Sequence, residues 1–280
     1  MAELDTITGQ RDPHTVATLT ADLEALGVPA GATVLVHSSV SAIGWVSGGA
    51  VAVVRALLDV LGTTGTLVVP TQSGSLSDPA TWSRPPIPEG WWQQVRDSMP
   101  AYDPATTPTR GMGAVVEVVR HLPGFLRSGH PQLSFGAVGP AGAGLLHPHP
   151  LSPGLGDGSP LSRLAESGAL TLLLGVGWEN ATCLHLGEAR SGVRAQVPTS
   201  APVLVEGRRE WTTWSDADWD ETDFAAVGTQ LESTGAVLTG RVGAASARLV
   251  LVADAADAAE RWFRLHPGAG ARAWAVSPPT

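Results

Sequence analysis

A buried strand that leads directly into a helix is the feature that most restricts how this chain can fold. Residues Ala169–Leu174 are almost all apolar and lie between two glycines, a pattern typical of a short strand inside a sheet. Asn180 follows soon after and is a favourable N-cap, which predicts a helix from Ala181 to about Ser191. A strand followed at once by a helix is the building unit of α/β folds.

The same alternation continues along the chain. Further helices are predicted over Thr15–Leu26, Ala50–Leu61, Met112–Leu122, Leu161–Glu166, Phe224–Glu232 and Ala255–Leu265. Further strands are predicted over Ala32–Val36, Thr66–Val69, Leu133–Val138 and Arg248–Ala253, with a hairpin over Val203–Trp211. These elements imply α/β layers around a mixed sheet. Because we find neither an internal repeat nor a clear linker, we expect residues 1–280 to form one domain.

Two long loops interrupt the pattern. Residues Thr71–Thr109 hold seven prolines and three tryptophans without sustained periodicity, and a loop of that length is usually functional. We expect it to line one side of a cleft. The second loop, His147–Ser159, begins with His147-Pro148-His149 and contains Asp157. The proline makes the two imidazoles diverge and no further ligand has suitable spacing, so we expect no metal site.

The composition excludes several classes of function. The chain contains no lysine, which rules out a P-loop lysine, a pyridoxal Schiff base and a lysine-based aldol mechanism. Its formal charge of −9 argues against nucleic acid as a partner and fits a cationic substrate, although an acidic surface for solubility is the ordinary explanation. The polar N-terminus and the absence of any apolar run near ~18 residues predict no signal peptide, no membrane partner and a cytoplasmic location.

Three polar side chains coincide on the helix predicted after the first strand. Thr182, His185 and Glu188 would lie at successive i+3 steps, within an arc of roughly 120°. They would project together at a strand end, where α/β proteins place ligands, although a helix with one satisfied histidine and a solvated glutamate is the ordinary alternative. The single cysteine, Cys183, excludes an internal disulfide and would point about 200° away from His185. We expect it to be buried and inert.

Other segments connect this stretch to a known family. They are His37–Gly49, Pro108–Gly113 and Arg127–Pro131. In the same order, these segments resemble the aminoglycoside N3-acetyltransferases, and residues 175–188 resemble that family's signature around its active histidine. The resemblance extends from about Leu35 to His266. It implies a three-layer α/β/α-like sandwich around a mixed sheet, with long Pro-rich loop insertions.

The resemblance also implies how acetyl-coenzyme A binds. In the family, the segment matching His37 to Ser41 lines the pantetheine channel, and the segment matching Arg110 to Gly113 lies at the other side of the cosubstrate. Arg110 and Arg127 are candidates for phosphate binding because guanidinium recognises phosphate oxygens bidentately. The predicted coenzyme A-binding residues are His37, Ser38, Ser39, Ser41, Arg110, Gly111, Met112, Gly113 and Arg127.

Acidic residues are the candidates for the other substrate. Residues 216–223 hold five acids, whose ordinary explanation is a solvated loop before a helix. In the family, a comparable segment faces the amino sugar and supports the histidine; Asp218 is the best match and Asp216 the second. Glu188 and Trp82 complete the predicted acceptor-binding residues.

The resemblance implies acetylation of the 3-amino group of a 2-deoxystreptamine aminoglycoside, and hence antibiotic resistance. His185 would be the general base, a role that contributes typically ~10²–10⁴-fold, oriented by Glu188 or by an acid near Asp218. Thr182 would donate to the developing oxyanion, and acetyl would pass directly to the amine. Two alternatives stay open: acylation of another amine in biosynthesis, and non-catalytic sequestration of a cationic drug. The sequence also leaves open whether the protein is a homodimer.

Overall fold

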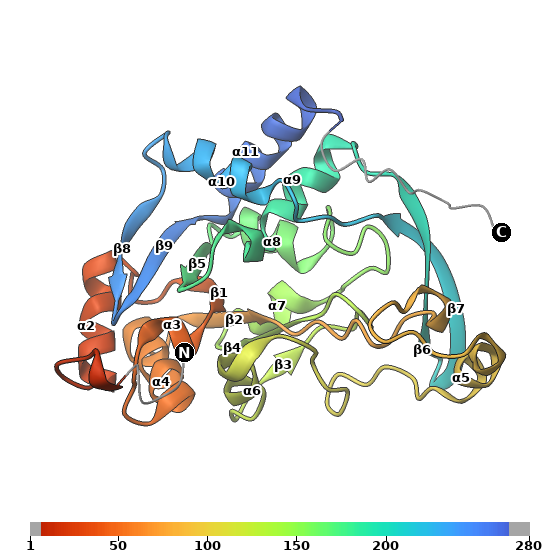
Figure 1. The fold of residues 1–280 in the computed structure, drawn as a ribbon, viewed down its shortest axis with the longest axis horizontal. Helices are drawn as coiled ribbons and strands as arrows, with labels where there is room; N and C mark the ends of the chain where they lie inside the picture. The colour runs from red at the N-terminus through yellow and green to blue at the C-terminus, as the bar shows by residue number, and fades with distance from the viewer. Residues whose placement is uncertain (1–6, 269–280) are drawn as a thin grey trace.

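A mixed sheet forms the centre of the computed structural model, which describes residues 7–268. Its strands are β1 (Thr33–Ser38), β2 (Thr66–Pro70), β3 (Leu126–Arg127), β4 (Phe135–Val138), β5 (Leu170–Leu174), β8 (Leu238–Val242) and β9 (Ala245–Leu251). They lie in the order β3-β4-β2-β1-β5-β9-β8 (Figure 1). β1 pairs in parallel with β2 and β5, whereas the outer strands are antiparallel to their neighbours. The predicted mixed sheet is confirmed.

Helices cover both faces of this sheet. They are α2 (Val16–Leu26), α3 (Val40–Ile43), α4 (Gly49–Leu61), α6 (Gly113–Arg120), α7 (Gly142–Leu146), α8 (Pro160–Glu166), α9 (Leu184–Ser191), α10 (Phe224–Glu232) and α11 (Val252–Leu265). None of the helices between residues 7 and 268 has the length and apolar character that a membrane crossing requires.

Neighbouring residues of the central strands enter two different cores, because successive side chains of a strand point to opposite faces. Val34 and Val36 of β1 pack in the core that contains α2, α4 and α6. Leu35, between them, packs in the core that contains α7 to α11. The sheet is therefore the middle layer of three, with the two helical layers on either side of it in Figure 1. The expected three-layer arrangement is confirmed.

The central strands fix where ligands can bind. β1, β2 and β5 run in parallel, so their carboxyl ends, at Ser38, Pro70 and Leu174, meet at one edge of the sheet. Loops that leave parallel strands at this edge form the ligand crevice of open α/β sheets.

The segment after β5 differs from its prediction. Residues Trp178–Asn180 form a short 3-10 helix, η3, and Ala181 then adopts the non-helical angles φ −77° and ψ 79°. The α-helix α9 consequently begins at Leu184, with Cys183 at the N-cap position, so the prediction of Asn180 as the N-cap was wrong. The side chain of Asn180 donates instead to the adjacent Glu179. Thr182 therefore precedes the helix that carries His185.

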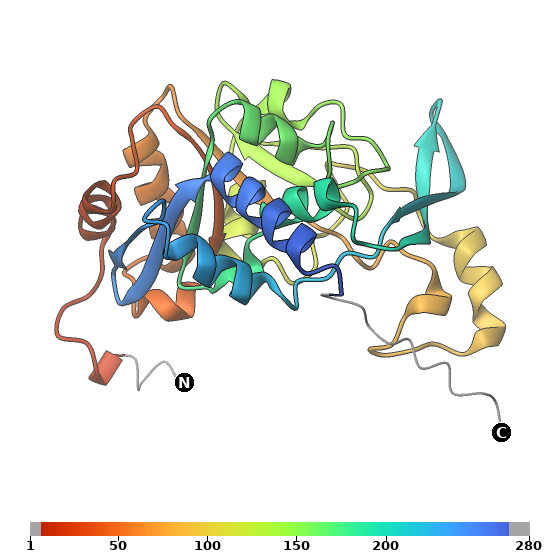
Figure 2. The same cartoon turned by 90° about the horizontal axis from the view of Figure 1, so that it is seen from above.

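The proline-rich segment after β2 contains more structure than its sequence suggests. It holds two 3-10 turns, η1 (Pro79–Thr81) and η2 (Glu89–Trp91), and the helix α5 (Trp92–Ser98). α5 packs beside a hairpin of β6 (Gln196–Val205) and β7 (Arg208–Ala217), where Arg209 Nε donates to the Met99 carbonyl at 2.7 Å. Figures 1 and 2 both show α5 and the hairpin together at one side of the molecule. The predicted hairpin is confirmed, with longer strands.

Candidate active site

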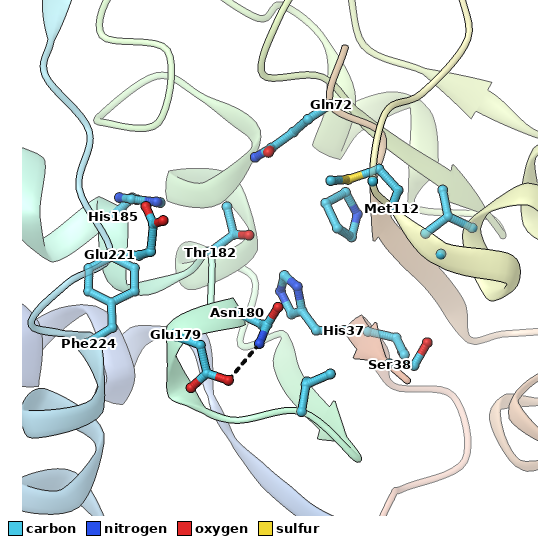
Figure 3. A pocket seen from close by; sticks show the side chains of 16 residues that line it. His37, Ser38, Gln72, Met112, Glu179, Asn180, Thr182, His185, Glu221 and Phe224 are labelled. Carbon is cyan, nitrogen blue, oxygen red and sulfur yellow. Dashed lines mark hydrogen bonds between the residues drawn. The ribbon is translucent and has the colours of Figure 1, made fainter. Parts of the chain in front are cut away.

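A cavity of about 300 Å³ lies where the central parallel strands end. His37 and Ser38 enter it from the end of β1, Pro70 from the end of β2, and Val176 from the turn after β5. The remaining lining residues are Val36, Gln72, Gly111, Met112, Gly113, Val116, Glu179, Asn180, Thr182, His185, Glu221 and Phe224. Figure 3 shows His185 and Glu221 on one side of this cavity and Met112 on the other. We call it the central cavity.

His185 is held in one orientation by a carboxylate and two aromatic rings. Its Nδ1 lies 2.5 Å from Oε2 of Glu188, one turn further along α9. Edge-to-face contacts with Phe224 and Trp219, at centroid distances of 4.6 and 5.4 Å, confine the imidazole plane. A carboxylate at Nδ1 selects the tautomer in which Nδ1 carries the proton, which leaves the Nε2 lone pair available. The predicted pairing of His185 with Glu188 is thus present in the structure.

Glu188 is fully buried and has a second partner that the sequence did not reveal. Its Oε1 accepts a hydrogen bond from Nε of Arg194, whose side chain is also buried. The Arg194 guanidinium in turn donates to the Asp220 carbonyl at 2.9 Å and lies over the Phe263 ring. Arg194 follows the end of α9 at Gly192, so the helical spacing that relates His185 to Glu188 does not extend to it.

A close helix contact anchors this pair. α9 crosses α11 at Gly187, where a Cβ atom would stand only 2.0 Å from the carbonyl oxygen of Ala256. Only glycine therefore permits the two backbones to approach so closely. Because His185 and Glu188 flank this contact, the packing of α9 on α11 fixes their position relative to the sheet.

Thr182 and Cys183 differ in their access to the cavity. Thr182 lines the central cavity from the loop before α9. Cys183 is completely buried, and burial raises the pKa of its thiol to about 12. A thiol with so high a pKa carries almost no thiolate and is a poor nucleophile near neutral pH. The expectation that Cys183 is buried is confirmed, and its inertness stays a prediction.

The segment after β1 contributes a second histidine to the cavity. His37 is only 7% exposed, and among the described residues its Nε2 has no hydrogen-bond partner. Burial, assisted by the nearby His185, lowers the pKa of His37 to about 4, so that this imidazole is neutral at physiological pH. Ser38 also lines the cavity, whereas the hydroxyls of Ser39 and Ser41 lie 3.1 Å apart and hydrogen-bond to each other.

The predicted residues 110–113 lie on two cavities. Gly111, Met112 and Gly113 line the central cavity, and Gly113, the first residue of α6, has a positive φ of 83° that favours glycine. Arg110 instead lines a neighbouring cavity of about 410 Å³ together with Trp82. Trp82, predicted on the acceptor side, thus shares a cavity with a residue predicted for the cosubstrate.

Arg127 is buried rather than available to a phosphate. Its side chain is nearly inaccessible, and its nitrogens donate to the hydroxyls of Ser73 and Ser134 and to the carbonyls of Thr71 and Thr107. These bonds tie the start of the long loop to β3. All three guanidinium nitrogens of Arg127 thus donate to groups of the protein itself. The structure therefore does not favour phosphate binding by Arg127.

His149 is similarly occupied by structural contacts. Its Nδ1 lies 2.8 Å from the Ser128 hydroxyl and its Nε2 lies 2.8 Å from the Gly154 carbonyl. Both ring nitrogens are thereby engaged in holding the loop of residues 147–159. Burial lowers the pKa of His149 to about 3.

The acids that line the central cavity are not the two that we predicted. Asp216 is buried, accepts a hydrogen bond from Trp219 Nε1 at 3.2 Å, and has its pKa raised by burial. Asp218 is exposed and does not line the cavity. Glu221 of the same acidic segment does line it, as does Glu179 from η3. One carboxylate of the acidic segment therefore reaches the cavity, and sequence spacing did not show which one.

Comparisons with known proteins show the family to which this chain belongs. A sequence profile described as aminoglycoside 3-N-acetyltransferase matches residues 35–264. The chain belongs to this family. Among its aminoglycoside 3-N-acetyltransferase relatives, aminoglycoside N(3)-acetyltransferase VIII of Streptomyces fradiae is 38% identical, over 97% of this chain and 99% of its own.

Other relatives extend the comparison to structures. The prophage-derived aminoglycoside N(3')-acetyltransferase-like protein YokD of Bacillus subtilis is 47% identical, over 90% of this chain and 93% of its own. A crystal structure of YokD has a TM-score of 0.91 and covers 94% of this chain and 97% of that one. The AAC-IIIb enzyme in a binary complex with CoASH is 29% identical with a TM-score of 0.81, over 91% and 98% of the two chains.

Proposed function

We propose that this protein transfers an acetyl group from acetyl-coenzyme A to the 3-amino group of a 2-deoxystreptamine aminoglycoside, with His185 as general base. The observation that carries the proposal is the buried His185–Glu188 pair beside a cavity at the strand ends. Family membership supports the reaction class, and the CoASH complex of AAC-IIIb supports coenzyme A as the donor.

The geometry suits direct transfer. With Nδ1 bound to Glu188, Nε2 of His185 accepts the proton that the acceptor amine loses as its nitrogen attacks the thioester carbonyl. A C–N bond forms, the C–S bond breaks, and coenzyme A leaves as the thiolate. Thr182, which lines the same cavity, is our candidate donor to the developing oxyanion. The inert Cys183 argues against an acetyl-enzyme intermediate.

Carboxylates at the cavity suit a cationic acceptor. Glu179 and Glu221 line the central cavity and are our candidates for binding its ammonium groups. Acceptor binding by Asp216 and Asp218, which we predicted from the sequence, remains a prediction. Their positions support it less than those of Glu179 and Glu221, because neither aspartate lines the central cavity. Acetylation neutralises one ammonium group of the drug, so we expect expression of the protein to raise aminoglycoside resistance.

The experiment is a thiol-release assay with acetyl-coenzyme A and a panel of aminoglycosides and unrelated amines, with the acetylated position determined by NMR. We expect turnover with aminoglycosides and modification of N3. His185→Ala should lower kcat by at least ~10²-fold while coenzyme A still binds, since a general base acts on the chemical step. Turnover only with other amines would support a different acylation, and none with any amine would support drug sequestration.

A further inference from the structure

The Gln72 side chain is a polar group of the central cavity to which the proposed reaction gives no role. It lines the cavity from the segment that follows β2. Figure 3 shows it directed toward the side of the cavity where Thr182 and His185 lie. In the part of the chain that the structure describes, no hydrogen bond engages its amide group. The amide is therefore available to a ligand of the central cavity.

The backbone on either side of Gln72 is held by the neighbouring strand segment. The N–H of Thr71 donates to the Ser134 carbonyl at 2.8 Å. The N–H of Ser73 donates to the Gln132 carbonyl at 2.9 Å. These two bonds continue the antiparallel register of β2 and β4 beyond the ends of both strands. The residue between them is therefore fixed as firmly as a residue of the sheet.

The alternation of side chains along this segment directs Gln72 into the cavity. Thr71 and Ser73 are fully buried and belong to the hydrogen-bond network around Arg127. The guanidinium donates to the Ser73 hydroxyl at 2.7 Å, and the Thr71 hydroxyl donates to the Ser134 hydroxyl at 3.1 Å. Because successive side chains of an extended segment point to opposite sides, Gln72 points away from this network. The buried Arg127 thus helps to position a cavity residue.

Gln72 is also tied to the opposite wall of the cavity. Its backbone carbonyl accepts a hydrogen bond from the Arg110 N–H at 2.9 Å. Residues 111–113, which follow Arg110, line the central cavity themselves. The amide of Gln72 is consequently placed before any ligand enters. A donor that is placed in advance stabilises developing charge without a cost of reorganisation during the reaction.

The chemistry of the amide indicates what it serves. The ammonium groups of a cationic acceptor have the carboxylates of Glu179 and Glu221 available in the same cavity, and a carboxylate cannot donate to an oxyanion. Two amide side chains line the cavity, and that of Asn180 already donates to Glu179 at 2.9 Å. Gln72 therefore carries the uncommitted amide donor. Attack on a thioester carbonyl places negative charge on its oxygen, which is where such donors contribute most.

Resting on the proposed function, we propose that Gln72 is a second catalytic donor that acts together with Thr182. Its Nε2 N–H donates to the oxygen that becomes negative when the acceptor nitrogen attacks the thioester carbonyl. The C–N bond forms as the electron pair of the carbonyl π bond moves onto this oxygen, and the amine proton passes to Nε2 of His185. The pair returns when the C–S bond breaks and the thiolate leaves. Gln72 remains neutral and transfers no proton.

Two substitutions of nearly constant size test this role. Gln72→Met removes the amide, and Gln72→Glu replaces it with a carboxylate that has no N–H. Both should lower kcat by ~10²–10³-fold, the loss that follows removal of one oxyanion donor. KM for the aminoglycoside should stay within threefold of the wild-type value. The control is Gln230→Met, at an exposed position of α10, which should retain wild-type kcat.

The kinetic results decide between a catalytic and a binding role. If both variants keep kcat within threefold of wild type, the proposal is wrong. An increase in KM for the aminoglycoside at unchanged kcat would also overturn it, because the amide would then bind the acceptor rather than the oxyanion. Each variant should unfold at the urea concentration of the wild type, which separates loss of a donor from loss of the fold.

A binding measurement needs neither turnover nor an acceptor. S-trifluoroacetonyl-coenzyme A hydrates at its carbonyl and presents a tetrahedral carbon, whereas S-acetonyl-coenzyme A keeps a planar carbonyl. By isothermal titration, wild-type protein should bind the tetrahedral analogue more tightly, as expected of a site complementary to the transition state. Gln72→Met should reduce this preference at least tenfold and keep its affinity for S-acetonyl-coenzyme A within threefold of wild type.

The titration separates failure of this inference from failure of the proposed function. An unchanged preference in Gln72→Met would refute the role of Gln72, even if acetylation of N3 is established. A reduced preference in a protein that acetylates no amine would refute only the proposed reaction. If neither analogue binds wild-type protein, both the coenzyme A donor and the role of Gln72 are refuted.

Discussion

Glu188→Gln tests whether a buried carboxylate controls His185. Glutamine keeps the size of the side chain and removes its charge. Both oxygens of Glu188 are engaged, one with Nδ1 of His185 at 2.5 Å and the other with Arg194, and neither Glu188 nor Arg194 is appreciably exposed. The substitution therefore alters a catalytic contact and removes the carboxylate charge that pairs with Nε of the buried Arg194.

Each consequence has an expected size. Removing one partner of a buried ion pair typically costs about 3–5 kcal/mol, so we expect a loss of that order in the free energy of unfolding. The glutamine amide can donate to Nδ1 and stabilise the wrong tautomer of His185, and the corresponding Asp→Asn change in serine-protease triads lowers kcat by about 10⁴. We therefore expect kcat to fall by ~10²–10⁴-fold.

Two assays and two further variants separate these effects. Urea denaturation gives the free energy of unfolding, and the thiol-release assay gives kcat. Glu179→Gln, at an exposed acid of the same cavity, should change the free energy of unfolding by less than ~1 kcal/mol. Glu188→Gln combined with Arg194→Met removes both partners of the pair; its free energy of unfolding should differ from the sum of the two single effects, because the residues are in contact, and the double variant should remain catalytically impaired. If Glu188→Gln stays within threefold of wild-type kcat, Glu188 does not position the base.

The remaining predictions concern nucleophile, acceptor and pH. Cys183→Ala should retain most activity because the thiol is buried; complete loss of activity in a folded protein would favour a covalent route. Glu221→Gln should lower kcat/KM for the aminoglycoside more than Asp218→Asn does, since only Glu221 lines the central cavity, and steady-state kinetics with the reverse order would contradict this. Burial keeps three histidines neutral by lowering their pKa from 6.5 to between about 3 and about 4: His37, His130 and His149. As the pH falls, these histidines are protonated in the unfolded chain before they are protonated in the folded protein. Their contribution to the free energy of unfolding is therefore fully present above pH 6.5 and decreases below it, by up to ~1.4 kcal/mol per pH unit for each histidine. Urea denaturation between pH 7.5 and 5 should show this decrease, and a flat profile would refute it.

Much of the fold could be predicted from the sequence, because it depends on local pattern. Apolar runs such as Ala169–Leu174 form strands wherever the chain buries them, and glycines and prolines end them within a residue or two. Helical spacing placed His185 and Glu188 together, since residues three apart on a helix share a face. The edge of the sheet that carries the site also followed from the order of strands and helices.

Tertiary structure decided which polar side chains meet. Arg194 contacts Glu188 only because the chain turns back after Gly192, and Arg127 is buried because strand and loop residues supply all of its acceptors. The start of α9 depended on the backbone angles of Ala181, for which the sequence offers no signal. Trp82 and Arg110 share a cavity although they are far apart in the chain. Side-chain burial and long-range pairing are set by the packing of the whole domain. The local sequence therefore determined the helices and strands, whereas tertiary contacts determined which polar groups meet at the ends of the strands.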